Sequence, residues 1–210
     1  VGYNPGESKT FQKNDLPELI EIALKPELKI NFLVQSAIGE PLTDVQVQYA
    51  QLGSNHNKSW ANVSDKDGRL SLTGLPRQEY EFTFTHSNHA QTKAQHRVSV
   101  NAMLEHIITM KTGAQLWGNV SNAKGEPMVK AKVWLSAINT NSYKQDLSSE
   151  TDSNGLYRIK GIPEGDYQIY FRKNGVRSWG NSSVDAIVIH LSAGQELQQD
   201  LKEPTVENAG

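Results

Sequence analysis

Trp117 and Trp134 are the residues of this 210-residue chain whose type and spacing most favour ligand binding. Each lies in a stretch of alternating apolar and polar residues, and a turn at Gly125 separates the two stretches. A hairpin about this turn pairs Val120 with Ala131 and therefore places the two tryptophans opposite each other on the outer face. Aromatic rings stack on the C–H faces of sugars, so the sequence predicts a two-tryptophan platform for a glycan chain. The alternatives are that a neighbouring module, a loop or the C-terminal segment covers the pair, or that the register differs.

The histidines have the spacing of a metal site but not the number of ligands that it needs. His86 and His89 form an H-x-x-H pair, and His96 and His106 follow in later strands. A zinc site requires three or four convergent ligands held by further hydrogen bonds, and nothing beyond the spacing supports one. We therefore interpret these four as surface histidines and expect no metal and no cofactor.

The other polar residues fit turns better than catalysis. Asp65 and Asp67 resemble the opening of a calcium loop, but a third oxygen ligand and a closing glutamate are missing. Trp60 and Trp179 lie in Asn- and Ser-rich stretches, where we expect them to cap the ends of a core. The chain contains no nucleophile elbow, phosphate loop or HExxH motif. The sequence therefore predicts a protein that is not an enzyme.

The elements that must position these residues occur twice, about 86 residues apart. In both copies a Gly-x-Pro turn, an alternating strand, an Asp-Gly or Asn-Gly turn and a second Gly-x-Pro corner follow in the same order. Glycine supplies the positive φ of tight turns, and proline ends a strand because it has no N–H for the ladder. A repeated β-module favours an architectural role. The matched segments are Gly39–Pro41 and Gly125–Pro127, Ser64–Leu72 and Thr151–Ile159, Gly74–Pro76 and Gly161–Pro163, and Tyr80–Phe84 and Tyr167–Phe171.

Inside each copy apolar residues recur at every second position, which is typical of half-buried strands. About seven short strands per copy, separated by turn residues, predict an all-β fold of two antiparallel sandwiches. The predicted inward positions are Ile30, Phe32, Val34, Val45, Val47, Tyr49, Leu70, Leu72, Tyr80, Phe82, Phe84, Val98, Val100, His106, Ile108 and Met110 in the first copy, and Leu116, Gly118, Val120, Ala131, Val133, Leu135, Tyr157, Ile159, Tyr167, Ile169 and Phe171 in the second, with weaker strands near 184–191 and 197–201.

Composition excludes some partners and favours some compartments. A formal net charge of −2 leaves no basic footprint for nucleic acid or anionic membranes. The absence of cysteine fits a bacterial surface or periplasmic protein, or a cytosolic one. No apolar stretch approaches the roughly 20 residues that span a membrane, so we expect no membrane insertion.

The domain boundaries follow from the repeat. We predict one module over residues 27–112, a second over 113–204 and a tail over 205–210. Residues 1–26 have the layout of the closing strands of such a module, and we interpret them as the end of a preceding repeat; docking on the edge of the first module is the alternative. The chain starts at Val1 without a methionine, so we interpret it as a piece of a longer protein.

These motifs resemble the carboxypeptidase regulatory-like family, whose transthyretin-like (prealbumin-like), immunoglobulin-like sandwich is also similar to the Cna B-type repeats of bacterial adhesins. The second module carries the whole pattern of turns, from Gly125 to Tyr167. The first module departs from it at Ser64, where the family has threonine, and at Gln78, where the family has glycine. We expect both departures to weaken the turns there.

The resemblance implies a non-catalytic spacer, accessory or adhesion segment of a larger extracytoplasmic protein, at the cell surface, in the periplasm or secreted. Its expected partners are neighbouring domains of the same polypeptide, together with a polysaccharide or a surface protein. The fold is grouped with carbohydrate-binding-like sandwiches, which keeps the glycan platform as the alternative function. Some Cna B-type repeats carry a Lys–Asn cross-link, but no lysine occupies a predicted inward position of either first strand, so we expect none here.

Overall fold

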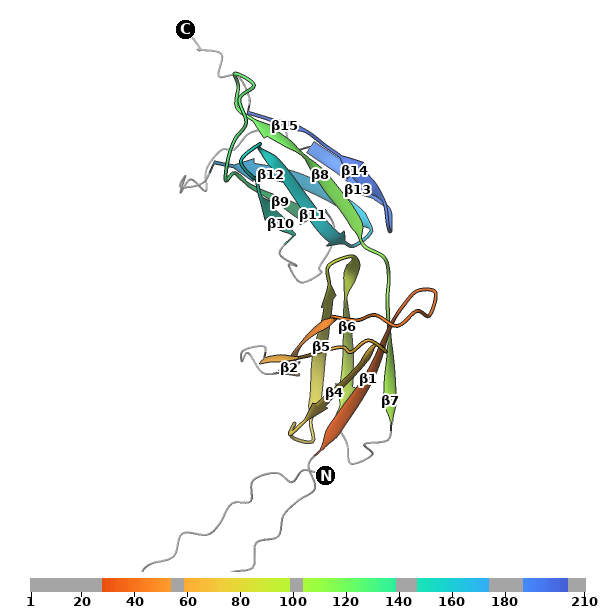
Figure 1. The fold of residues 1–210 in the computed structure, drawn as a ribbon. Helices are drawn as coiled ribbons and strands as arrows, with labels where there is room; N and C mark the ends of the chain where they lie inside the picture. Colours follow the sequence, from red (N-terminus) through yellow and green to blue (C-terminus); the bar gives the residue numbers. More distant parts are fainter. Residues whose placement is uncertain (1–27, 54–58, 99–103, 139–146, 174–186, 204–210) are drawn as a thin grey trace, which may run out of the picture. The chain divides into compact units, whose positions relative to one another are not determined.

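The computed structural model describes residues 28–53, 59–98, 104–138, 147–173 and 187–203, and all regular secondary structure in these ranges is β-strand. The predictions for residues 1–26 and for the tail at 205–210 lie outside the described residues. None of the described segments forms a helix long and apolar enough to cross a membrane. The fold is all-β, as predicted, and comprises two sandwiches (Figure 1).

The first sandwich consists of a three-stranded sheet in the order β4-β1-β7 and a four-stranded sheet in the order β3-β2-β5-β6. The paired strands β1 and β4 are antiparallel, with Phe32 opposite Leu70. The strand bounds are β1 Lys29–Ser36, β2 Gln46–Gln51, β3 Ser59–Val63, β4 Arg69–Thr73, β5 Glu79–His86, β6 His89–Arg97 and β7 Glu105–Met110.

The second sandwich repeats this plan. One sheet has the order β10-β9-β12-β13, and the other has the order β11-β8-β14, with β15 also pairing β8. Both β14 and β15 run parallel to β8, and they act as one closing strand interrupted at residues 199 and 200. The strand bounds are β8 Ala114–Ser121, β9 Lys132–Ala137, β10 Ser148–Glu150, β11 Leu156–Ile162, β12 Gly165–Arg172, β13 Ile187–Leu191, β14 Glu196–Gln198 and β15 Leu201–Lys202.

Two compact units divide the chain at slightly different places from the predicted module boundaries. The first unit consists of three segments, namely the chain up to Gln35, Glu40–Phe84 and Lys93–Ile108. The second unit holds Ser36–Gly39, Thr85–Thr92 and the chain from Thr109 onward. The predicted modules, 27–112 and 113–204, therefore stay a prediction.

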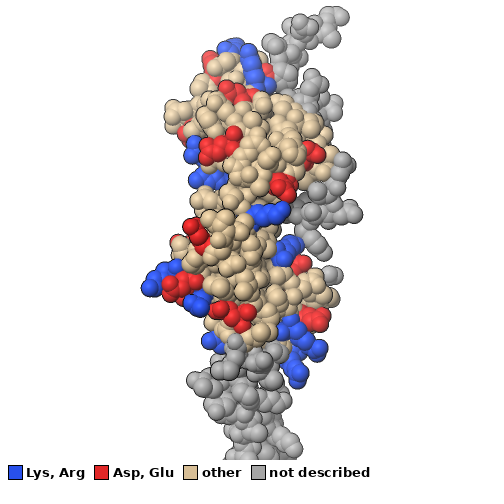
Figure 2. All heavy atoms as spheres, turned by 90° about the vertical axis from the view of Figure 1, so that its right-hand side faces the viewer, with Lys and Arg blue, Asp and Glu red and all other residues tan. Residues whose placement is uncertain are grey.

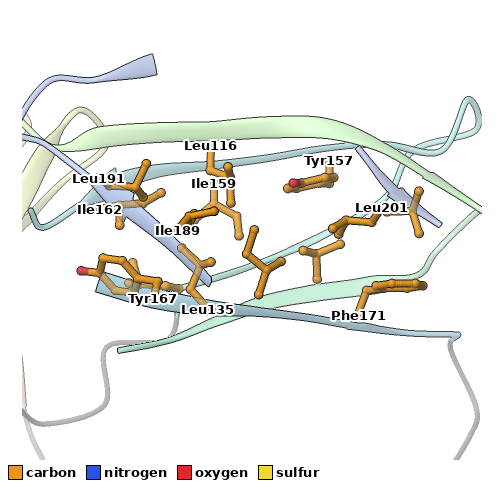
Figure 3. Close-up of a cluster of buried hydrophobic side chains, with 14 of the residues drawn as sticks. Leu116, Leu135, Tyr157, Ile159, Ile162, Tyr167, Phe171, Ile189, Leu191 and Leu201 are labelled. Atoms are coloured by element: carbon orange, nitrogen blue, oxygen red, sulfur yellow. The ribbon is translucent and has the colours of Figure 1, made fainter. Parts of the chain in front are cut away.

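Alternation decides which side chains form each core. In β1 every second residue is buried, and Phe32 packs edge-on against Phe82 and Phe84, with ring centroids 4.9 and 5.2 Å apart. In the second sandwich the same alternation sends side chains from both sheets into one apolar layer, which Figure 3 shows between the two sets of strands. The labelled members of this layer are Leu116, Leu135, Tyr157, Ile159, Ile162, Tyr167, Phe171, Ile189, Leu191 and Leu201.

A buried hydroxyl ties the strands together at the same place in each copy. The Thr151 hydroxyl donates to the Met128 carbonyl and accepts from the Ala131 N–H at 2.8 Å. Ser64 does the same in the first sandwich, donating to the Leu42 carbonyl at 2.7 Å and accepting from the backbone N–H of Val45 at 2.9 Å. The serine therefore forms both bonds of the family's threonine, and the expected weakening at Ser64 stays a prediction.

The aspartate after this hydroxyl builds the next turn. Asp152 Oδ1 accepts the backbone N–H groups of Asn154 and Leu156 at 2.8 and 2.9 Å. Asp65 Oδ1 accepts those of Asp67 and Arg69 at 2.9 and 2.8 Å, which confirms the interpretation of Asp65 as a turn residue. Side-chain oxygens that mimic a backbone turn in this way explain why both copies use aspartate here.

A tyrosine closes the second corner of each copy. Tyr167 donates to the Pro163 carbonyl at 2.8 Å, whereas Tyr80 donates to the Pro76 carbonyl at 3.4 Å. In the second sandwich Gly165 lies between the two at a φ of 154°, a conformation that residues with a Cβ rarely adopt. The first copy has Gln78 at the corresponding position. Its longer bond agrees with the expected weakening there.

Three predictions about strands were incomplete or wrong. The strand predicted through Val98 and Val100 lies earlier in the chain, as β6, and ends at Arg97. Val98 is buried but outside a strand, and Val100 lies outside the described residues. Strands β3 and β10 were not predicted, since neither shows apolar alternation in its few residues. The predicted β8–β9 hairpin is also wrong, with consequences for the tryptophans.

Candidate functional site

The two candidate tryptophans lie in different sheets. Trp117 in β8 is opposite Arg158 of β11 and Gln198 of β14, whereas Trp134 in β9 is opposite Ser148 of β10 and Tyr170 of β12. The predicted pairing of Val120 with Ala131, and with it the two-tryptophan platform, is therefore wrong. Both side chains still alternate with buried neighbours and are half-buried on the outer face of their own sheet.

A short turn sends the chain from one sheet to the other and explains the error. The hairpin begins as predicted, with a bridge between Ser121 and Pro127 and a bond from the Met128 N–H to the Val120 carbonyl. At Lys130 the backbone adopts a φ of 56°, and its N–H then bonds to the Thr151 carbonyl. The first sandwich makes the same switch, with Asp44 at a φ of 58°.

Trp134 instead forms an aromatic pair with Tyr170. Their rings are stacked, with centroids 5.6 Å apart and planes 15° from parallel. The guanidinium carbon of Arg172 lies 5.7 Å from the centre of the Trp134 ring, within the range of a cation–π contact. The Tyr170 hydroxyl donates to Oε1 of Gln168. We call the outward side chains Trp134, Tyr170, Arg172, Gln168 and Ser148 the aromatic face.

The strands around the aromatic face set its chemistry. Ser148, opposite Trp134 on the side away from Tyr170, has a small side chain. Further along β12, Asp166 Oδ1 lies 2.8 Å from His190 Nδ1 of β13. An aromatic stack bordered by amide, guanidinium and hydroxyl groups can hold a flat ligand with an apolar face and hydroxyl edges.

Charge elsewhere on the surface is mixed. Figure 2 shows acidic and basic side chains interspersed over the displayed face. The ion pairs of the described residues are exposed or half-buried, such as Lys93 with Glu81 at 3.0 Å and Lys111 with Glu164 at 3.1 Å. Such pairs contribute little to stability, and they form no focused field for a charged ligand.

The buried tyrosines are structural. Burial raises the pKa of Tyr157, and the charge of Asp200 adds to that effect. Burial also raises the pKa of Tyr167, and burial and then Tyr49 raise that of Tyr80. These phenols stay protonated near neutral pH and serve as hydrogen-bond donors to backbone carbonyls.

The histidines form two pairs. His86 and His89 approach to 2.9 Å between their Nδ1 atoms, and the rings of His96 and His106 lie 4.1 Å apart between centroids. Among the described residues no group of three or more His, Cys, Asp or Glu could hold a metal ion. The interpretation of all four as surface histidines is wrong for His96, whose Nε2 atom is buried.

The remaining candidates divide by whether the structure describes them. No lysine side chain in the described ranges is buried, and the first strands bury Ile30, Phe32 and Val34, or Leu116 and Val120, at the predicted inward positions. The Trp60 side chain and Trp179 lie outside what the structure describes. Sequence reasoning missed Tyr170 and Arg172, although their alternation with Ile169 and Phe171 could have marked both as outward.

The comparisons with known proteins concern the second sandwich and the general fold. Residues 115–202 match the family model of the carboxypeptidase regulatory-like domain, which confirms the predicted resemblance for that segment. No curated protein matches the chain.

Solved structures similar to this chain include bacterial pilins. The TIE protein of Bacillus anthracis is 12% identical with a TM-score of 0.36, and the match covers 87% of this chain but 37% of that one. The minor pilin GBS52 of Streptococcus agalactiae is 15% identical with a TM-score of 0.39, over 87% of this chain and 99% of that one. The major pilin subunit BcpA of Bacillus cereus is 9% identical with a TM-score of 0.34, over 84% and 99%.

Proposed function

We propose that this chain is a non-catalytic tandem β-sandwich segment of a larger bacterial protein outside the cytoplasm, where it acts as a spacer, accessory or adhesion module. Its partners are then the neighbouring domains of the same polypeptide and a surface protein or polysaccharide. The chain has no cysteine, and its charge is close to balanced, which fits such a setting.

The observation that carries this proposal is that the polar side chains repeated in both copies form hydrogen bonds to backbone groups of their own sandwich. Thr151 and Asp152 bond to backbone groups at the start of the turn, and Tyr167 bonds to a backbone carbonyl at the corner. Residues whose bonds are satisfied in this way hold strands together and are not available to a substrate. Catalytic sites instead gather titratable groups with strongly shifted pKa values in a cleft.

The spacer and adhesion roles can be separated by exchanging the segment. Residues 27–204 of the parent protein are replaced by an unrelated pair of β-sandwiches of the same length. A spacer role predicts that surface display and binding by the parent protein are kept, whereas an adhesion role predicts that display is kept and binding is lost. If the chain is found in the cytoplasmic fraction, and not at the cell surface, in the periplasm or in the medium, when cells are fractionated, the proposed location is wrong.

The aromatic face supports carbohydrate binding as a second candidate function. Trp134 is stacked on Tyr170 on one side, and the small Ser148 side chain follows on the other. In this version of the glycan hypothesis Trp134 carries the binding and Trp117, in the opposite sheet, does not take part.

Tryptophan fluorescence titrated with a panel of polysaccharides tests this second candidate. We expect a saturable change that Trp134→Ala abolishes and that the matched variant Trp117→Ala keeps. If the wild-type chain gives no change with any polysaccharide, or if Trp134→Ala binds as well as the wild type, the aromatic face is not a glycan site.

A further inference from the structure

The last strand of the first sandwich, β7, is held at its start by a pair of imidazoles. His106 of β7 and His96 of β6 have ring centroids 4.1 Å apart, and both rings contact Phe32 of β1, at 5.8 and 5.6 Å. His96 also lies 6.3 Å from Phe82 of β5. Phe32 and Phe82 are completely buried, so the pair forms part of the wall of the apolar core.

One ring nitrogen of this pair has no hydrogen-bond partner that could accept from it if the ring were protonated. His96 Nε2 is buried and has no hydrogen-bond partner in the part of the chain that the structure describes. A neutral imidazole needs a donor on one nitrogen only, whereas an imidazolium must donate from both. Protonation would therefore place a desolvated charge against aromatic rings and beside a second histidine.

Charged neighbours do not compensate such a charge. The inward side chains of the strands packed against the pair are apolar or aromatic. Those that can titrate are the phenols of Tyr80 in β5 and Tyr49 in β2. The charged side chains alternate with these residues and point to the outer faces. They are Arg69 with Glu105 at 3.1 Å, Lys93 with Glu81 at 3.0 Å, and Lys29, Glu79 and Arg97.

We propose that the His96–His106 pair is an acid-sensitive latch that holds β7 on the first sandwich at neutral pH and releases it when the pair is protonated. β7 is an edge strand of the β4-β1-β7 sheet, so its separation exposes its own buried residues Ile108 and Met110 but leaves the pairing of β1 with β4 in place. Edge elements with few neighbours are the first to open in local unfolding.

The sign of the effect follows from linkage. Burial lowers the pKa of His96 and of His106 below the ordinary 6.5, and for His96 the charge of His106 lowers it further. The open form therefore binds more protons than the closed form below about pH 6.5, so the closed form loses stability as the pH falls through that range.

In the second sandwich a tyrosine hydrogen bond, and not a histidine pair, holds the closing segment of β14 and β15. Tyr157 donates a hydrogen bond of 2.7 Å to the Gln199 carbonyl between β14 and β15. Burial raises the pKa of this phenol, so the bond does not titrate at mildly acid pH. Where the first sandwich pairs Phe32 with Leu70, the second pairs Gly118 with Tyr157. The second sandwich is therefore an internal control within the same chain.

Hydrogen exchange of the whole chain, read residue by residue by NMR, tests the latch. Between pH 7.5 and pH 5.0 we expect the protection factors of the β7 amides to fall by about tenfold or more, because the open form takes up protons that the closed form excludes. Those of β8 and β11 should stay unchanged. The variant H96Q/H106Q should lose this pH dependence, and the matched variant His190→Gln should keep it.

Titration of the imidazole resonances provides the second readout, on the wild-type chain, should the double variant fail to fold. Half-protonation of His96 and His106 below pH 6.5, together with the loss of β7 protection, supports the proposal. Constant β7 protection, an equal loss in H96Q/H106Q, or imidazoles that titrate at or above pH 6.5 would overturn it.

Discussion

Gly118→Ala should destabilise the second sandwich severely, because a backbone segment occupies the space of the missing side chain. A Cβ at Gly118 would lie 2.1 Å from the Gln199 carbonyl oxygen, 2.6 Å from its carbon and 3.1 Å from Asp200 Oδ1. Contact distances between heavy atoms are about 3.5 Å, so the segment between β14 and β15 has to move by more than about 1 Å. No rotation of a flexible side chain can relieve the contact, since two of the three atoms belong to the backbone.

The size of the effect follows from the bonds that this movement breaks. The Gln199 N–H donates to the Trp117 carbonyl at 2.8 Å, and Tyr157 donates to the Gln199 carbonyl at 2.7 Å. The Asn119 N–H donates to the Asp200 carboxylate at 2.8 Å. Two neutral bonds at about 1 kcal/mol and one to a charged group at about 2 kcal/mol amount to about 4 kcal/mol. Alanine lowers the conformational entropy of the unfolded chain, which offsets about 1 kcal/mol of this loss of stability.

Urea unfolding of wild type and variant measures the difference. We expect Gly118→Ala to lower the free energy of unfolding by about 3 kcal/mol, which corresponds to a fall in Tm of more than about 10 °C. Asn119→Ala is the matched control, because the Asn119 side chain is exposed and its backbone N–H makes the bond; its effect should stay within about 0.5 kcal/mol. A Gly118→Ala variant as stable as this control would refute the account of how the closing segment lies against β8.

Three further predictions concern the repeated motif and the histidines. Thr151→Val removes both bonds of a buried hydroxyl and should lower the free energy of unfolding by about 2–3 kcal/mol. Thr151→Ser should stay close to wild type, because Ser64 makes the same bonds in the first sandwich. Equal losses in the two variants, measured by urea unfolding, would contradict this. Tyr167→Phe should cost about 1 kcal/mol and Tyr80→Phe less, since their bonds to proline carbonyls measure 2.8 and 3.4 Å; thermal unfolding that ranks the two variants the other way would show that the bond length is not the cause. Because burial lowers the pKa of His96 and His106, the free energy of unfolding of the first sandwich should fall as the pH drops below about 6.5, and calorimetry at pH 7.5 and 5.0 that finds no fall would contradict the sign.

Alternation and turn residues predicted most of the fold from the sequence. The buried positions of β1, β5, β8 and β12 match the apolar alternation, from Phe32 and Phe82 to Leu116 and Phe171. These patterns are local, since side-chain direction along a strand depends only on its period of two. The turns were also predictable, because Asp152 and Gly155 act within a few residues of their own positions.

Sheet membership could not be read in the same way. Alternation tells which face of a strand is buried but not which sheet the strand joins, so the sequence predicts a pairing of Trp117 with Trp134 that the structure does not have. The decisive residue is Lys130, whose φ of 56° is a conformation that its residue type does not favour. The aromatic stack of Trp134 with Tyr170 depends on the pairing of β9 with β12, which are far apart in the sequence. Contacts of this kind carry no local signal.

Stretching single molecules of the whole chain between its two ends tests the central claim most directly, namely that the chain is a tandem of two sandwiches that each fold around a core of their own. We expect two separate unfolding events, each releasing roughly 25–30 nm of chain, the length of about 85 extended residues less the folded span. A single event that releases both lengths together, or a gradual extension without distinct steps, would contradict it.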